Sequence, residues 1–206
     1  MQRAIAYIDG FNLYFGLKEA NWKKYYWLNV HKLAQQLLGA KSRLIITKYF
    51  SSRVSATSRD PHKQARQSCF LDAMKTLPDV QLFMGHYLKK PQQCRHCHAR
   101  WNIYEEKMTD VNIAVEMLTD AFQDNFDSAL LISADSDLTS PIAAIRGLFP
   151  HKSIVVAFPP GRRSWQLRTV ATSTTTIGRP ALEKSLFPDE IVLPSGFHLH
   201  RPDSWR

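Results

Sequence analysis

The stretch Ala129-Leu130-Leu131-Ile132-Ser133-Ala134-Asp135-Ser136-Asp137 decides the fold of this chain. Its first part is a short, continuous apolar run, which is typical of a strand buried on both faces in a parallel sheet. The run is followed by two aspartates, and an ionised carboxylate is costly to bury without a partner. We therefore expect Asp135 and Asp137 to lie at an edge of the sheet.

The start of the chain repeats this arrangement. The apolar run Ala4-Ile5-Ala6-Tyr7-Ile8 is followed directly by Asp9. Gly10 then permits a tight turn, and Asn12 can supply an amide oxygen or cap the next helix. Two separate stretches of the chain thus read as a buried strand that ends in an acidic residue.

The acidic residues are expected to meet in one place, because open parallel sheets bind ligands beyond the carboxyl ends of their strands. If the two apolar strands are neighbours, Asp9, Asp135 and Asp137 share one crevice. Asp110, at the start of a helical stretch, would add a fourth carboxylate at the same edge. Carboxylates this close repel one another unless cations hold them, and Mg²⁺ and Mn²⁺ prefer such oxygen ligands.

Strands and helices alternate along the chain. The expected strands are Arg3–Ile8, Arg43–Phe50, Val80–Leu88, Ser128–Ser133 and Ser153–Phe158. The expected helices are Val30–Leu38, 61–76, Thr109–Phe122, Pro141–Phe149 and Ser164–Val170. This order predicts an α/β fold, a three-layer sandwich with a mostly parallel central sheet.

The chain is long enough for one domain with a sizeable core. We assign residues 1–178 to this domain, with an irregular basic insertion at about 88–106, and residues 179–206 to a C-terminal extension. From about Phe187 onward the spacing of prolines indicates an extended tail. The helix Thr109–Phe122 is the most regular, with one apolar face formed by Val111, Ala114, Val115, Leu118 and Phe122.

The charge of the chain favours a polyanionic partner. It contains 27 Lys and Arg against 18 Asp and Glu, a net charge of +9, which suits nucleic acid. The candidate contacts are Lys107, Arg59, Lys63, Arg100, Arg162 and Arg163. Aromatic residues lie among the basic ones, as in proteins that stack single-stranded bases. The same aromatic residues would equally suit the core or a homodimer interface.

Sequence features also bear on location. No apolar run approaches the roughly 18–20 residues that span a membrane. The N-terminus enters a strand at once and lacks the features of a signal peptide. The three cysteines are an odd number, which argues against a disulfide framework and for a reducing compartment. Together these features predict a cytoplasmic protein.

Cys94 and Cys97 have the spacing of a zinc knuckle, and a structural zinc ion takes four ligands. His96 and His98 lie within or beside the pair and are awkwardly placed for the same ion. His86 is the better third ligand, and the site is either completed by another chain or vestigial. The alternative is a loop with two free thiols.

Three ordered stretches resemble the NYN domain, a branch of the PIN-like metal-dependent ribonucleases, and more narrowly its bacterial LabA-like members. They are Tyr7-Ile8-Asp9-Gly10-Phe11-Asn12-Leu13, Glu106-Lys107-Met108-Thr109-Asp110-Val111 and Ser133-Ala134-Asp135-Ser136-Asp137, within a resemblance over about Arg3–Thr176. The resemblance implies a five- or six-stranded parallel sheet and Mg²⁺ or Mn²⁺ held by Asp9, Asp110, Asp135 and Asp137, with Asn12 in support.

The function that this resemblance implies is cleavage of single-stranded or structured RNA by a metal-activated water. One alternative is a catalytically weak nucleic-acid-binding or regulatory protein that keeps the fold. Another is a metal-dependent phosphatase acting on small phosphorylated substrates. The basic and aromatic surface favours a polymer over a small molecule.

Overall fold

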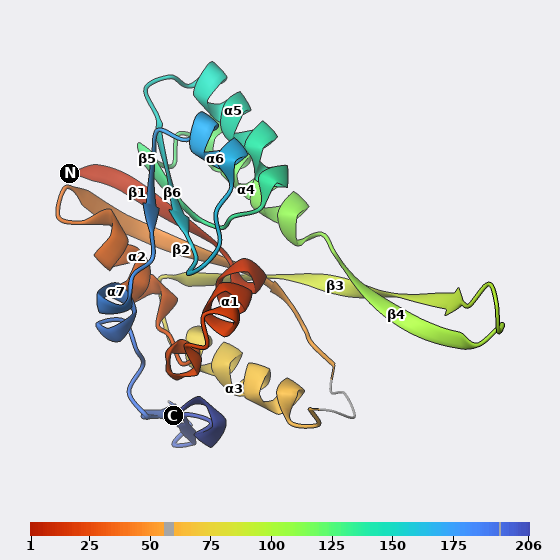
Figure 1. Ribbon diagram of the computed structural model, residues 1–206. Coiled ribbons are helices and arrows are strands. Elements are labelled where there is room, and N and C mark those ends of the chain that lie inside the picture. Colours follow the sequence, from red (N-terminus) through yellow and green to blue (C-terminus); the bar gives the residue numbers. More distant parts are fainter. Residues whose placement is uncertain (56–59, 194) are drawn as a thin grey trace.

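A single mixed sheet forms the centre of the molecule (Figure 1). The computed structural model describes residues 1–55, 60–193 and 195–206, with the backbone alone at 89 and 103–106. The sheet has the order β4-β3-β2-β1-β5-β6-β7. Only β3 and β4 pair antiparallel, and the other neighbours are parallel. The strands are β1 (Gln2–Asp9), β2 (Ser42–Ser52), β3 (Val80–Gln93), β4 (Arg100–Lys107), β5 (Ser128–Ile132), β6 (Ser153–Phe158) and β7 (Ser173–Thr176).

Helices cover both faces of the sheet. They are α1 (Gly10–Glu19), α2 (Val30–Leu38), α3 (Lys63–Lys75), α4 (Thr109–Phe122), α5 (Thr139–Leu148), α6 (Trp165–Val170) and α7 (Arg179–Glu183). Alternate residues of a strand point to opposite faces. Accordingly Ala6 and Ile8 of β1 join the core beneath α1, α2, α3 and α7, whereas Ile5 and Tyr7 join the core beneath α4, α5 and α6. The predicted three-layer α/β sandwich is confirmed.

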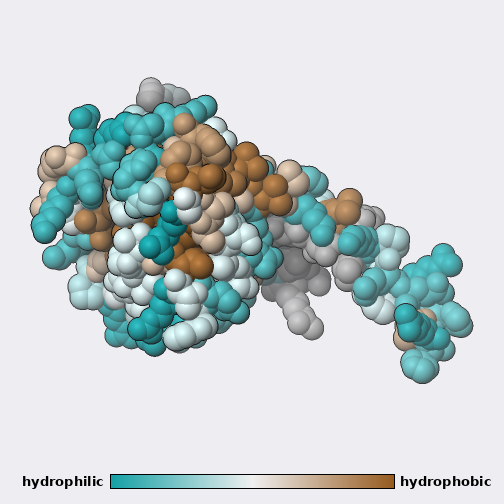
Figure 2. Space-filling model, turned by 90° about the horizontal axis from the view of Figure 1, so that it is seen from above, coloured by the Kyte–Doolittle hydropathy of each residue, from teal (hydrophilic) through white to brown (hydrophobic). Residues whose placement is uncertain are grey.

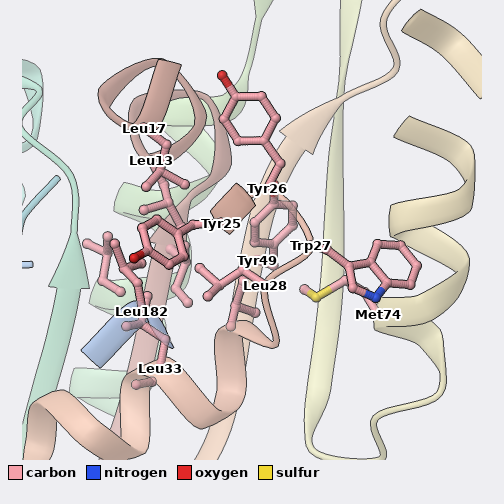
Figure 3. Packing of buried hydrophobic residues seen from close by; sticks show 14 of the residues in the cluster. Leu13, Leu17, Tyr25, Tyr26, Trp27, Leu28, Leu33, Tyr49, Met74 and Leu182 are labelled. Carbon is pink, nitrogen blue, oxygen red and sulfur yellow. The ribbon is translucent and has the colours of Figure 1, made fainter. Parts of the chain in front are cut away.

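The first of these two cores is rich in aromatic side chains (Figure 3). Tyr25, Trp27 and Tyr49 lie within it beside leucines and Met74. Trp27 is fully buried, and its indole N–H donates to the carbonyl oxygen of Pro188 at 2.7 Å. The aromatic cluster around Trp27 therefore belongs to the core, one of the two roles that the sequence left open for it.

Two expectations for irregular segments were wrong. The insertion at about 88–106 is a regular hairpin, because β3 continues to Gln93 and pairs with β4. The segment from Phe187 is not an extended tail: it forms the antiparallel pair β8 (Glu190–Val192) and β9 (His198–His200) and a final turn over Asp203–Trp205. Phe187 and Leu199 are buried in the first core, and Trp205 packs against it. Apolar residues spaced between prolines gave no periodic signal for this packing.

Helix α4 has the predicted bounds, but its expected apolar face is not the side that enters the core. Val111, Val115 and Phe122 are 54%, 54% and 65% exposed, whereas Ile113 and Met117 are fully buried. Helix α4 has apolar side chains on two sides, so periodicity alone could not choose the buried one. Figure 2 shows apolar surface on the upper face of the molecule, running toward the hairpin.

A buried ion network joins β1 and β2 to α4. The Lys48 ammonium donates to Asp120 Oδ2 at 2.6 Å and to Glu116 Oε2 at 2.7 Å. The Tyr7 hydroxyl also donates to Asp120 Oδ2, at 2.5 Å. The side chains of Lys48 and Asp120 are only 9% and 6% exposed, so each charge depends on the other inside the second core.

Within the described residues, no helix is long and apolar enough to cross a membrane. The cytoplasmic location expected from the sequence stays a prediction.

Candidate functional site

The carboxyl ends of β1 and β5 lie side by side at the centre of the sheet. The two strands pair in parallel from Ala4 opposite Ser128 to Ile8 opposite Ile132. The neighbour relation assumed from the sequence is therefore confirmed. Side chains that follow these strands meet at one edge, together with the first turn of α4. There Asp9, Asp110 and Asp135 each offer a ligand atom within 4.8 Å of the others, and we call these three residues the acidic group.

Asp9 is the most firmly held member of the acidic group. Its Oδ1 caps α1 by accepting the Asn12 backbone N–H at 2.9 Å, and its Oδ2 accepts the Asn12 side-chain amide at 3.0 Å. The Ser133 hydroxyl donates to the same Oδ2 at 2.9 Å. Asp9 is 3% exposed, and its burial raises the pKa of the carboxyl, against the lowering effect of these hydrogen bonds. A divalent cation would favour the ionised form that burial opposes.

The other two members are half-buried and therefore accessible from solvent. Asp135 caps the short turn η2 (Ser136–Leu138), and its Oδ1 accepts the backbone N–H of Asp137 at 3.0 Å. Its own N–H donates to Ser133 Oγ at 3.0 Å. Asp110 lies in the first turn of α4, which follows Met108 in a left-handed conformation with φ of 80°. One buried and two accessible carboxylates are a suitable oxygen donor set for Mg²⁺ or Mn²⁺.

Asp137 lies outside the acidic group. Its side chain is exposed and its backbone is tied to Asp135 through the turn. The sequence placed it with the other three because residues two apart along a strand share a face. Here the chain has already left β5 and turned, so that spacing no longer applies. Its assignment as a fourth metal ligand stays a prediction.

Asn12 links the acidic group to a basic residue. Its side-chain oxygen accepts the Ala134 N–H at 3.3 Å and lies 3.4 Å from an Arg162 guanidinium nitrogen. The same guanidinium lies over the Phe15 ring, 5.8 Å from its centroid. Asn12 therefore positions Asp9 and the turn after β5, and its supporting role at a metal site stays a prediction. The expectation that Asn12 might cap the helix was wrong, because Asp9 is the cap of α1.

A cavity of about 130 Å³ has Gly10, the residue that follows Asp9, in its wall. A cavity of this size can hold one aromatic ring system. Lys63 and Arg66 also contribute to the wall. Its aromatic lining includes Phe11, Tyr14, Phe15, Tyr26, Tyr87 and Trp205. The sequence did not indicate this cavity, because its walls come from segments at both ends of the chain.

Gly10 has no room for a side chain. An added Cβ would lie 2.5 Å from Tyr49 Cζ and 2.7 Å from the Phe50 carbonyl oxygen. We expect Gly10→Ala to lower the free energy of unfolding by about 1–3 kcal/mol, because backbone must shift to relieve the overlap. Gly147→Ala is the control, since nothing lies within 4 Å of that position in α5, and it should raise stability by about 0.5–1 kcal/mol. Urea unfolding measures both, and equal effects would contradict the packing of Tyr49 on Gly10.

The remaining basic candidates are spread over the molecule. Lys63 lines the cavity, and Arg163 is exposed beside Arg162. Lys107 ends β4, three residues before Asp110, while Arg100 is exposed at the far end of the hairpin. Arg59 lies outside the described residues. The structure thus places Arg162 beside Asn12 and Lys63 in the cavity wall, and every contact with nucleic acid stays a prediction.

His86 cannot share a zinc ion with Cys94 and Cys97 of the same molecule. It lies within β3, and Cys94 follows the end of that strand. Eight residues of extended chain span about 26 Å, so this part of the zinc prediction is wrong. The sequence could not show that the segment between them is one straight strand.

Ser133 was not among the predicted site residues. Its hydroxyl donates to Asp9 and accepts from Asp135 N–H, so it joins two members of the acidic group. Ser133 directly follows β5, just as Asp9 ends β1. This position was the feature of the sequence that could have identified Ser133 as a site residue.

Comparisons with known proteins agree with this geometry. The NYN domain profile matches residues 3–178. The chain therefore belongs to the NYN domain family, a branch of the PIN-like nucleases. The narrower LabA-like assignment stays a prediction.

Two individual proteins are similar to this chain. One is 6-hydroxy-3-succinoylpyridine 3-monooxygenase HspA of Pseudomonas putida, at 25% identity over 70% of this chain and 55% of that protein. The chain thus spans about half the length of this curated relative. The other is the crystal structure of a Vibrio parahaemolyticus protein of unknown function, with a TM-score of 0.54 and 19% identity over 90% of this chain and 96% of that one. The second likeness shows the fold alone.

Proposed function

We propose that this protein is a ribonuclease that depends on Mg²⁺ or Mn²⁺. The observation that carries the proposal is the convergence of Asp9, Asp110 and Asp135 from three separate elements. Three carboxylates this close repel one another, and a bound cation would relieve that repulsion. Membership in a family of PIN-like nucleases supports the same reading.

The acidic group would hold the metal. A divalent cation bound there would polarise the scissile phosphate and lower the pKa of a bound water. Asn12 and Ser133 fix the Asp9 oxygens by three hydrogen bonds, so this carboxylate is already oriented. Asp135 and Asp110 face solvent and leave room for a phosphate. Whether Asp137 contributes as a fourth ligand is part of the proposal.

The surroundings of the acidic group favour a nucleotide polymer as substrate. Arg162, which pairs with Glu19 and lies near Asn12, would offer a positive charge to a phosphate beside the metal. The aromatic cavity can receive one base by stacking, while Lys63 and Arg66 face the adjoining backbone. Lys107, Arg163 and Arg100, with Arg59, would extend the contact along the RNA. Binding should therefore weaken as the salt concentration rises.

Cleavage of a 5′-labelled single-stranded RNA tests this function. The purified chain is incubated with Mn²⁺, with Mg²⁺ or with EDTA, and the products are resolved by length. We expect cutting with either metal and none with EDTA, with a 5′-phosphate on the downstream product. Phosphate release from mononucleotides in place of cutting would point to a small-molecule phosphatase. Salt-sensitive RNA binding without cutting would instead indicate a regulatory protein that keeps the fold.

A further inference from the structure

The β3–β4 hairpin carries its cysteines away from the rest of the molecule. Pairing of β3 with β2 ends at Gly85 opposite Ser52. Beyond this point β3 and β4 pair only with each other, through eight residue pairs from His86–Lys107 to Gln93–Arg100. This two-stranded segment is about 24 Å long, and Figure 1 shows it projecting from the sheet. Within the described residues no third strand pairs with this segment, and a two-stranded hairpin alone is at best marginally stable. A contact at its tip would stabilise it.

Backbone hydrogen bonds close the tip of the hairpin into a tight turn around the two cysteines. Cys94 N–H donates to the Ala99 carbonyl at 2.8 Å, and His98 N–H donates to the Cys94 carbonyl at 3.1 Å. His98 is left-handed, with φ of 55°, which closes the turn.

One molecule supplies only half of a zinc site. Cys94 and Cys97 are both free thiols, but a structural zinc ion takes four ligands. Among the described residues, the acidic group is the only set of three metal-binding side chains whose ligand atoms lie this close together. Neither His96 nor His98 joins the two thiols in such a set, and the His98 ring lies 3.3 Å from the Gln93 amide.

A second copy of the chain completes the site without any further ligand. We propose that the hairpin tips of two copies share one zinc ion, bound by Cys94 and Cys97 of each. Two identical half-sites related by a two-fold axis give the four thiolates that zinc needs. The projection of the tip lets two copies meet there while their bodies stay apart (Figure 2).

The charge at the tip suits four thiolates. Zinc with four thiolate ligands carries a net charge of −2. Arg95 lies between the two cysteines and Arg100 follows the turn, and both are exposed. Two copies would therefore bring four positive charges around this anionic centre. Without the ion the same arginines would repel each other, so pairing of the tips should depend on zinc.

Zinc content and molar mass of the full-length chain test the proposal. The protein is prepared with zinc and without chelator, then dialysed against excess Mg²⁺ so that the acidic group releases any zinc. We expect about one half zinc ion per chain, and light scattering at twice the monomer mass. A strong chelator should convert the dimer to monomer, and added zinc should restore it. Cobalt in place of zinc should give the intense thiolate charge-transfer bands that carboxylate ligands do not produce.

Variants at each cysteine complete the test. Cys94→Ser should lose the zinc and be monomeric, while its circular dichroism stays unchanged because the tip lies outside both cores. Cys69→Ser is the matched control. The Cys69 thiol lies in α3 and donates to the His200 carbonyl, so this variant should keep both the zinc and the dimer. One zinc ion per chain in a monomer would overturn the proposal, as would a wild-type protein without zinc. A dimer that persists in Cys94→Ser would also overturn it and would move the interface to another surface, such as the exposed face of α4.

Discussion

Asp135→Asn should lower metal-dependent RNA cleavage by about 10³-fold, the equivalent of several kcal/mol of lost transition-state stabilisation. The amide keeps an oxygen that can accept the Asp137 N–H, so the turn after β5 should stay intact. It removes one negative charge from the acidic group. Affinity for RNA in EDTA should not fall, because basic side chains supply the contacts with phosphate.

The measurement is single-turnover cleavage of labelled RNA by variants that are purified identically. Asp203→Asn is the matched control, because this carboxylate is 89% exposed and pairs with Arg206 near the C-terminus. It should cleave at the wild-type rate. Asp137→Asn then decides the role of the fourth aspartate: a loss comparable to that of Asp135→Asn would make it a ligand. Equal cutting by wild type and Asp135→Asn would show that a contaminant cleaves the RNA or that the site is misassigned.

Lys48→Met should lower the free energy of unfolding by about 3–5 kcal/mol, the usual cost of breaking a buried ion pair. The substitution leaves the Asp120 carboxylate inside the second core with only neutral donors, among them the Tyr7 hydroxyl. Lys75→Met is the control. Lys75 pairs with Asp72, and both side chains are exposed. Loss of this pair should therefore lower the free energy of unfolding by less than about 0.5 kcal/mol. Urea unfolding at neutral pH compares the two.

A second substitution should partly rescue the first. In Lys48→Met combined with Asp120→Asn the buried position is neutral, and its amide oxygen can still accept from Tyr7. We expect this double variant to recover about 1–3 kcal/mol relative to Lys48→Met alone, since the two side chains are in direct contact. A double variant less stable than Lys48→Met would show that the cost came from lost packing rather than from the unpaired charge.

Much of the fold could be predicted from local patterns. The apolar runs that end at Asp9 and Ser133 gave both central strands, and the helix at Val30–Leu38 was predicted with the bounds that it has. The buried side chains of these elements recur at a regular spacing, so the sequence pattern alone identifies the type and position of each element. The neighbour relation between the two strands was an inference, and it is confirmed. Both apolar runs are uninterrupted, which favours interior strands with a neighbouring strand on each side.

The sequence-based predictions that were wrong concerned features that depend on contacts between distant parts of the chain. The burial of Leu199 and the packing of Trp205 rest on partners from the first half of the chain. The straight path of β3 separates His86 from Cys94, and no residue between them signals it. Asp110 could be placed near the other carboxylates only by assuming that its helix begins at the same edge of the sheet, because the direction of α4 relative to β1 is a property of the packed molecule.

The position of β1 between β2 and β5 has a consequence for protein synthesis. Asp9 and Ser133 are separated by 124 positions in the chain, which a ribosome covers in roughly 6–25 s. Until β5 has emerged and paired with β1, Asp9 lacks its partners and the acidic group does not exist. Under the proposed function, the nascent chain would therefore be unable to cleave RNA until β5 has been made and has paired with β1.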